Sequence, residues 1–220
     1  MLHALAALAM AAAVAATSSN QPPHKTLVVW LIHRCGPATS CLPSRIVGSM
    51  QTETERIWSP LDVRLAWIDS VGAAATHAAG VTVMLEEGEY PESWASRDTV
   101  LAALTQPAGS CGWGVAHVWV RQIERHTALI RHGNQSFPAL PTALAETFLS
   151  RALGRTLAHE IGHYLLGTRE HAARGLMRPR FTPQDLLEDP ILPLYGLDSR
   201  DRARLIACRT DQDTASHGTR

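Results

Sequence analysis

His159-Glu160-Ile161-Gly162-His163 is the segment with the most specific chemical content in this chain of 220 residues. Residues four apart lie on one face of an α-helix about one turn from each other, so both imidazole rings can reach a single point. Glu160 follows the first histidine directly and flanks that point. This H-E-x-x-H spacing is typical of helices that bind zinc through two histidines and turn a carboxylate toward the water that the ion activates.

The residues around this segment predict a long helix from Pro141-Thr142 to Leu166, because alanine, leucine and glutamate dominate there. An apolar stripe steps by four along this helix and consists of Leu149, Leu153, Leu157, Ile161 and Leu165. His159 and His163 lie two residues from members of the stripe, so we expect them to point away from it. Gly167 follows the last predicted turn and is a C-cap signal, because glycine readily adopts the left-handed conformation that ends a helix.

Three residues beyond the helix compete to be a third metal ligand. A catalytic zinc has three protein ligands and an open position for water. His171 is the preferred candidate, because neutral imidazole binds zinc well and the loop after Gly167 is short. Glu170 is adjacent and would serve if the loop turned differently. Glu188 would serve from a later helix that is predicted to begin at Thr182-Pro183, with threonine as N-cap and proline at the first helical position.

The stretch 159–179 resembles the metzincin clan of zinc peptidases, whose pattern is H-E-x-x-H-x-x-G-x-x-H followed by a methionine turn. The resemblance implies one catalytic zinc ion and hydrolysis of peptide bonds. Three histidines would bind the ion, namely His159, His163 and His171. Glu160 would be the catalytic base, and Met177 would be the methionine of the turn beneath the metal.

The chain departs from the metzincin pattern at two places. Three residues rather than two separate His163 from Gly167, and three rather than two separate Gly167 from His171. One extra helical residue advances the exit of the chain by about 100° and 1.5 Å, and one extra loop residue can reach about 3.5 Å back. We therefore expect the two additions to compensate each other.

The order of the remaining elements favours an α+β fold. Four strands and one helix are predicted, with strands at Thr26 to His33, Val63 to Asp69, Val81 to Glu87 and Trp113 to Arg121, and the helix at Pro43 to Trp58. An extension of the fourth strand as far as His126 stays open. We expect His117 and His126 to be structural strand histidines. A role of either in binding substrate also stays open, because this strand borders the substrate cleft in the clan that the chain resembles. Strand, helix, strand favours a parallel pair with a right-handed crossover. This order is similar to that of the metzincin catalytic domain, which implies a twisted mixed β-sheet, a long zinc-binding active-site helix and a small helical C-terminal subdomain.

The N-terminus predicts export. Residues Ala4 to Ala16 form an unbroken run of Ala, Leu, Met and Val that ends in small residues, as a secretory cleavage site requires. We expect residues 1–16 to be a signal peptide, since the run is too short to span a bilayer. Residues 17–220 would form one zinc metallopeptidase-like domain with a flexible tail at 210–220. The mature protein would then be secreted or periplasmic.

Four cysteines in an exported chain indicate two disulfides, for which three connectivities exist. The favoured pairing joins Cys35 to Cys41, which closes a short loop after the first strand. It also joins Cys111 to Cys208, which ties the C-terminal helix to the sheet. No C-x-x-C spacing occurs, so a cysteine zinc site is not expected.

The charge of the chain is balanced, with 20 basic and 20 acidic residues. This balance gives no reason to expect a nucleic acid or an anionic membrane as partner, and no second segment is long and apolar enough to span a bilayer. We therefore predict a zinc-dependent peptidase that acts on a peptide or protein substrate. Two alternatives stay open: a noncatalytic secreted domain stabilised by zinc, and a zinc hydrolase that acts on another kind of bond. The sequence gives no indication of the oligomeric state.

Overall fold

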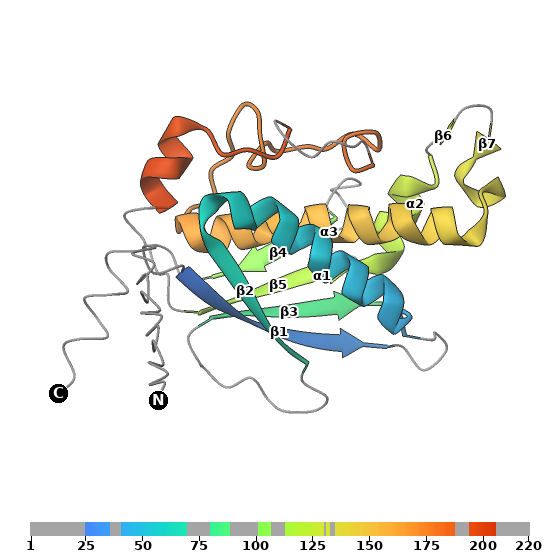
Figure 1. Cartoon of the computed structure of the whole chain (residues 1–220), viewed down its shortest axis with the longest axis horizontal. Coiled ribbons are helices and arrows are strands. Elements are labelled where there is room, and N and C mark those ends of the chain that lie inside the picture. The colour runs from blue at the N-terminus through green and yellow to red at the C-terminus, as the bar shows by residue number, and fades with distance from the viewer. Residues whose placement is uncertain are drawn as a thin grey trace, which may run out of the picture.

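The computed structural model describes residues 25–35, 41–69, 80–88, 101–106, 113–129, 131–132, 135–187 and 194–205. These residues form a mixed α+β structure in which two helices lie side by side over one face of a sheet (Figure 1). The predicted signal peptide and tail lie outside the described residues, and so do Cys111, Cys208 and Glu188. No described helix has the length and apolarity that crossing a membrane requires.

The sheet has five strands in the order β2-β1-β3-β5-β4. Their bounds are β1 Lys25–Arg34, β2 Val63–Asp69, β3 Gly80–Glu86, β4 Ala102–Thr105 and β5 Trp113–Trp119. The first four strands of this order pair in parallel, and β4 pairs antiparallel with β5 at the edge. Alternate residues of β1 are buried under the helices, because successive side chains of a strand point to opposite faces.

The helices and short elements complete the described chain. Their bounds are α1 Ser44–Trp58, η1 Ser59–Leu61, α2 Val120–Thr127, β6 Arg131–His132, β7 Gln135–Ser136, η3 Phe137–Ala139 and α3 Thr142–Leu166. Residues 199–205 are also helical. The Cys35–Cys41 disulfide is formed, as predicted, and closes the connection from β1 to α1.

Helix α3 confirms the predicted bounds but not the predicted one-sided burial. The leucine and isoleucine stripe is buried, yet every residue from Phe148 to Leu166 except Arg151 is buried as well. The reason is that α1 packs along α3, the sheet lies against it, and the chain after Gly167 returns along it. A helix enclosed in this way holds its polar side chains in defined positions, since water cannot replace their partners.

Two sequence expectations need correction, and one strand was missed. The fourth strand ends at Trp119 and does not include Arg121, because Val120 starts α2 and buries Val120, Ile123 and Thr127 at helical spacing. Strand β4 was not predicted. Residues 183–187 form turns rather than a helix, although Thr182 and Asp185 exchange backbone-to-side-chain hydrogen bonds of 2.7 and 3.2 Å as in a helix N-terminus. The capping signal at Thr182 is thus satisfied by one turn alone.

Candidate metal centre

Three histidine side chains meet at the C-terminal half of α3. Nε2 of His163 lies 3.0 Å from Nε2 of His159 and 3.3 Å from Nε2 of His171. All three offer a nitrogen atom within 4.8 Å of one another, and among the described residues no cysteine or carboxylate joins the group. The structure therefore brings together the three histidines that the sequence singled out.

Backbone carbonyls fix the two helix histidines. Nδ1 of His159 lies 2.7 Å from the carbonyl oxygen of Leu176, and Nδ1 of His163 lies 2.8 Å from that of Thr168. A carbonyl oxygen can only accept, so these hydrogen bonds assign the ring proton to Nδ1 and leave a lone pair on Nε2. Two lone pairs then face each other across 3.0 Å. A shared cation would stabilise this arrangement, and a carbonyl behind each ring is the usual outer partner of a metal-binding histidine.

Burial favours the neutral form of all three rings. Burial, together with the charge of the neighbouring histidines, lowers the pKa of His159 to about 3. Burial also lowers the pKa of His163 to about 4, and it lowers the pKa of His171. Since a metal ion binds neutral imidazole, no proton has to be displaced from these nitrogens at neutral pH.

The end of α3 explains how His171 reaches the pair despite the two extra residues. Gly167 has φ 59°, and the N–H groups of Gly167 and Thr168 donate to the carbonyls of Tyr164 and His163, each over 3.3 Å. This double hydrogen bond is the Schellman ending of a helix. The loop after Gly167 then turns the chain back beside the helix, which places His171 next to the pair.

Glu170 does not compete for the site. Its exposed carboxylate lies 2.9 Å from Nη2 of Arg204 and 3.6 Å from Nη1 of Arg200. The hydrogen bond and charge of Arg204 lower the pKa of Glu170. The carboxylate is thus engaged with the 199–205 helix rather than with the histidines.

Met177 is buried in a turn next to the histidine pair. The turn contains Gly175 with φ 81°, and the N–H of Arg178 donates to the Gly175 carbonyl over 3.4 Å. The thioether of Met177 packs against Gly162, where a Cβ would overlap its sulfur. The neighbour of Met177, Leu176, supplies the carbonyl that binds His159. The turn therefore fills the space beside α3 and orients one ring at the same time.

Glu160 lines a cleft of about 480 Å³. Residues of strand β4, the segment 179–183 and the three histidines line it as well. Burial raises the pKa of Glu160 to about 8, and a hydrogen bond from the Leu104 backbone N–H offsets part of that rise. A carboxyl group held beside a cation site in a cleft can exchange a proton with a bound reactant.

Comparisons with known proteins find similarity to solved structures. No protein-family model matches the chain, and no curated protein matches it. Among solved structures, the chain is similar to metalloproteinase-II from Bacteroides fragilis, with 14% sequence identity and a TM-score of 0.44. The match covers 84% of this chain and 53% of that protein, so the chain spans about half of the neighbour's length.

Two residues of the site were not found from the sequence, Phe181 and Leu104, and the expectation for His126 was wrong. His126 lies in α2 rather than on a strand, lines the cleft, and has its Nε2 3.3 Å from the carbonyl oxygen of Phe181. His117 lies on β5, pairs with Glu86 at 2.9 Å and is a structural strand histidine as predicted. The Phe181 ring meets the His159 ring edge-on, with centroids 5.6 Å apart. Leu104 contributes a backbone hydrogen bond to Glu160, and such a bond cannot be predicted from the type of residue.

Proposed function

We propose that this protein is a zinc-dependent peptidase in which His159, His163 and His171 hold one zinc ion and Glu160 is the general base. The observation that carries the proposal is the pair of Nδ1-to-carbonyl hydrogen bonds, which turn the Nε2 lone pairs of the helix histidines toward each other and toward His171. Catalytic zinc sites have three protein ligands and one open position, whereas structural sites are closed by four. Three neutral imidazoles at the edge of a cleft fit the first kind.

A zinc ion at this position would act as a Lewis acid toward a carbonyl in the cleft and would lower the pKa of a water molecule beside it. Glu160 would take a proton from that water and pass it to the departing amine. Burial alone favours the protonated form of Glu160, but an adjacent cation favours the carboxylate and so prepares it as a base. The N–H of Leu104 would keep this carboxylate beside β4.

The position of β4 favours an extended peptide as the substrate. This strand is last in the sheet order, it pairs only with β5 among the described strands, and residues 101–104 line the cleft. An edge strand presents backbone N–H and C=O groups that can pair with an added strand. A peptide aligned in this way would pass its backbone across the histidines and Glu160.

The test combines metal analysis with cleavage of a peptide library by the purified protein. We expect about one zinc per chain, cleavage that a chelator abolishes, and recovery when zinc is restored. Glu160→Gln should keep the zinc and lower kcat by about 10²–10⁴-fold. Glu170→Gln changes an exposed carboxylate of the neighbouring loop and should leave kcat unchanged.

Other outcomes of this test would refute the proposal or favour one of the two alternative functions. Wild-type turnover in Glu160→Gln would refute the assigned base. Stoichiometric zinc without cleavage of any peptide would favour the noncatalytic domain, and cleavage of ester but not peptide substrates would favour a hydrolase of another bond. A protein without zinc whose cleavage is unaffected by chelator would exclude the proposal altogether.

A further inference from the structure

One face of α3 carries four side chains that donate hydrogen bonds to residues 168–187, which we name the return segment. These side chains are spaced four residues apart, so they form a single row along the helix. The donor and acceptor pairs are Arg151 with the Leu187 carbonyl (3.1 Å), Arg155 with Asp185 (3.0 Å), His159 with Leu176 (2.7 Å) and His163 with Thr168 (2.8 Å). The acceptors follow the reverse order, so the return segment runs antiparallel to the helix and is held at four points.

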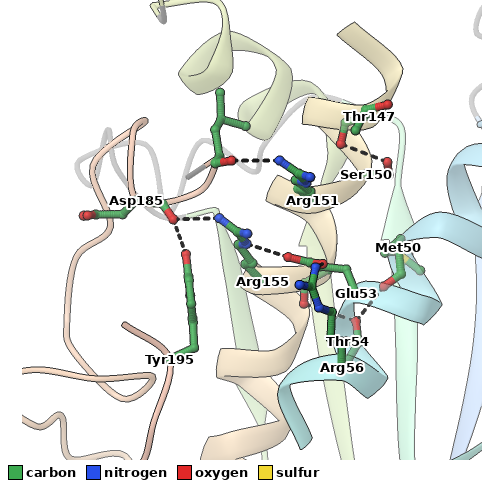
Figure 2. A network of polar contacts seen from close by, with 12 residues as sticks. Met50, Glu53, Thr54, Arg56, Thr147, Ser150, Arg151, Arg155, Asp185 and Tyr195 are labelled. Atoms are coloured by element: carbon green, nitrogen blue, oxygen red, sulfur yellow. Dashed lines mark hydrogen bonds and ion pairs between the residues drawn. The ribbon is translucent and has the colours of Figure 1, made fainter. Parts of the chain in front are cut away.

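Arg155 connects this row to α1 and to Tyr195. Its side chain is fully buried, and its Nε donates to Oε1 of Glu53 on α1 over 2.7 Å (Figure 2). Its Nη1 donates to the Asp185 carbonyl, which also accepts a hydrogen bond from the Tyr195 hydroxyl. The guanidinium lies 5.0 Å from the centre of the Tyr195 ring. One side chain thus joins α1, α3, the return segment and the chain that follows it.

The contacts of Tyr195 lead from Arg155 to the metal site. The Tyr195 ring stacks on Phe181, with centroids 5.5 Å apart and an interplanar angle of 12°. Phe181 meets the His159 ring edge-on and lines the cleft. The guanidinium of Arg178 also lies over the Phe181 ring, 4.4 Å from the ring centre. Phe181 therefore contacts an aromatic ring, a cation and a histidine of the site.

Stability alone does not account for an arginine at position 155. Nη2 of Arg155 is buried and has no hydrogen-bond partner among the described residues. Removing a charged group from water costs several kcal/mol that a single buried ion pair repays only with good geometry, and well-packed apolar residues are often as stable. What an apolar residue would lack is the planar set of donors that reaches Glu53 and the Asp185 carbonyl together.

We propose that Arg155 is a positioning residue of the metal site, acting through Tyr195 and Phe181 to fix the His159 ring and the cleft wall. The inference rests on the proposed metal site but not on the bond that is cleaved. It predicts that a change at Arg155 alters metal affinity, which a residue that only stabilises the fold would not alter well below the melting temperature.

The test measures the zinc dissociation constant by competition with a chromogenic chelator. Arg155→Lys keeps a cation near Glu53 but loses the planar donors and the stacking on Tyr195. Arg151→Lys is the matched control, because Arg151 ties the far end of the return segment and is one helical turn further from His159. We expect zinc affinity to fall about 10-fold in Arg155→Lys and to stay within about twofold in Arg151→Lys, by analogy with outer partners of zinc ligands.

A second pair of variants covers the case in which Arg155→Lys does not fold. Tyr195→Phe keeps the ring that stacks on Phe181, whereas Tyr195→Leu removes it, so only Tyr195→Leu should weaken zinc binding. Equal zinc affinities within each pair, with losses confined to melting temperature, would overturn the proposal. Wild-type protein that binds zinc but cleaves no peptide would refute the peptidase while leaving this measurement valid.

Discussion

Met177 packs its thioether against Gly162, in the turn of α3 between His159 and His163. A Cβ on Gly162 would overlap the sulfur and would come within 3.2 Å of Cε of Met177 and 3.6 Å of Cζ2 of Trp58. Leu176 precedes Met177 and accepts the hydrogen bond that assigns the proton of His159. The space beside Gly162 and the orientation of a metal-site histidine are therefore linked through two consecutive residues.

Gly162→Ala should destabilise the protein and weaken zinc binding together. Displacing a fully buried side chain costs about 1–3 kcal/mol, and movement of the turn would take the Leu176 carbonyl from His159. Denaturant unfolding and zinc titration measure the two effects. Gly48→Ala on α1 is the control, because a Cβ there meets nothing within 4 Å. If Gly162→Ala is destabilised but its zinc affinity is unchanged, the Met177 turn does not influence zinc binding.

His171→Ala should weaken zinc binding more than any change at Glu170. We expect a loss of more than about 100-fold in affinity, because even outer partners of zinc ligands contribute about 10–100-fold. Glu170→Ala should leave the affinity at the wild-type value, since this carboxylate pairs with Arg204 and Arg200. Chelator competition measures both variants. The reverse ranking would make Glu170 the third ligand.

The stability of the metal-free protein should have its maximum near pH 6.5. His159 and His163 have folded pKa values of about 3 and 4 against 6.5 in the unfolded chain, so the unfolded chain binds more protons and stability rises with pH up to about 6.5. Glu160 acts in the opposite direction, because its folded pKa of about 8 exceeds the ordinary 4.5 and the folded protein retains the proton. Two histidines outweigh one carboxyl below about pH 6.5, and above it Glu160 alone lowers stability until about pH 8.

Glu160→Gln isolates the contribution of that carboxyl group. Melting temperatures of the metal-free wild type should fall between about pH 6.5 and 8, and those of Glu160→Gln should fall less over the same range, since the amide does not ionise. The difference between the two proteins should grow with pH and level off above about pH 8. A difference that is independent of pH would mean that Glu160 titrates normally in the folded protein.

Acidic peptides should be better substrates than their amide counterparts. Arg169 and Arg180 are exposed and line the cleft, where Glu160 is the only carboxylate among the described lining residues. Exposed ion pairs contribute about 0.2–1 kcal/mol, so replacing Gln by Glu near the cleaved bond should raise kcat/KM about 1.4–5-fold at low salt. Salt near 1 M should remove the preference, because it shortens the screening length to about 3 Å.

Charge reversal locates the source of this preference. Arg180→Glu should lower kcat/KM for the acidic peptide and leave the amide peptide less affected. Arg174→Glu is the control, since Arg174 is exposed on the return segment but does not line the cleft. Equal effects of the two reversals would indicate a general electrostatic attraction rather than contacts within the cleft.

The features that were predicted from sequence have local signals. Helix α3 is predicted by its composition and by Gly167 at its end, and the histidine pair by its four-residue spacing. Strand β4 has no such signal, because its four residues, Ala102–Thr105, do not alternate and become a strand only by pairing with β5. Val120 suits a strand as well as a helix, and its burial with Ile123 decides for α2.

The parts of the site that were not predicted are of two kinds. Some depend on backbone groups, and the others belong to the row of arginines and histidines along α3. The carbonyls of Leu176 and Thr168 have no side-chain signature, so the hydrogen bonds that orient the histidines cannot be predicted from residue types. Arg151 and Arg155 were visible in principle, because they share the four-residue spacing of His159 and His163. A search for apolar periodicity passes over such a row, since it counts only hydrophobic positions.

Because the return segment runs antiparallel to α3, the histidine geometry can be transferred to another protein only together with that segment. A five-residue motif grafted onto a foreign helix would carry two imidazoles with no acceptor behind them, and each ring could exchange its tautomer. A transplant that preserves the ligand geometry must include α3 from Arg151 onward together with residues 168–187, so that ligands and acceptors arrive as one unit.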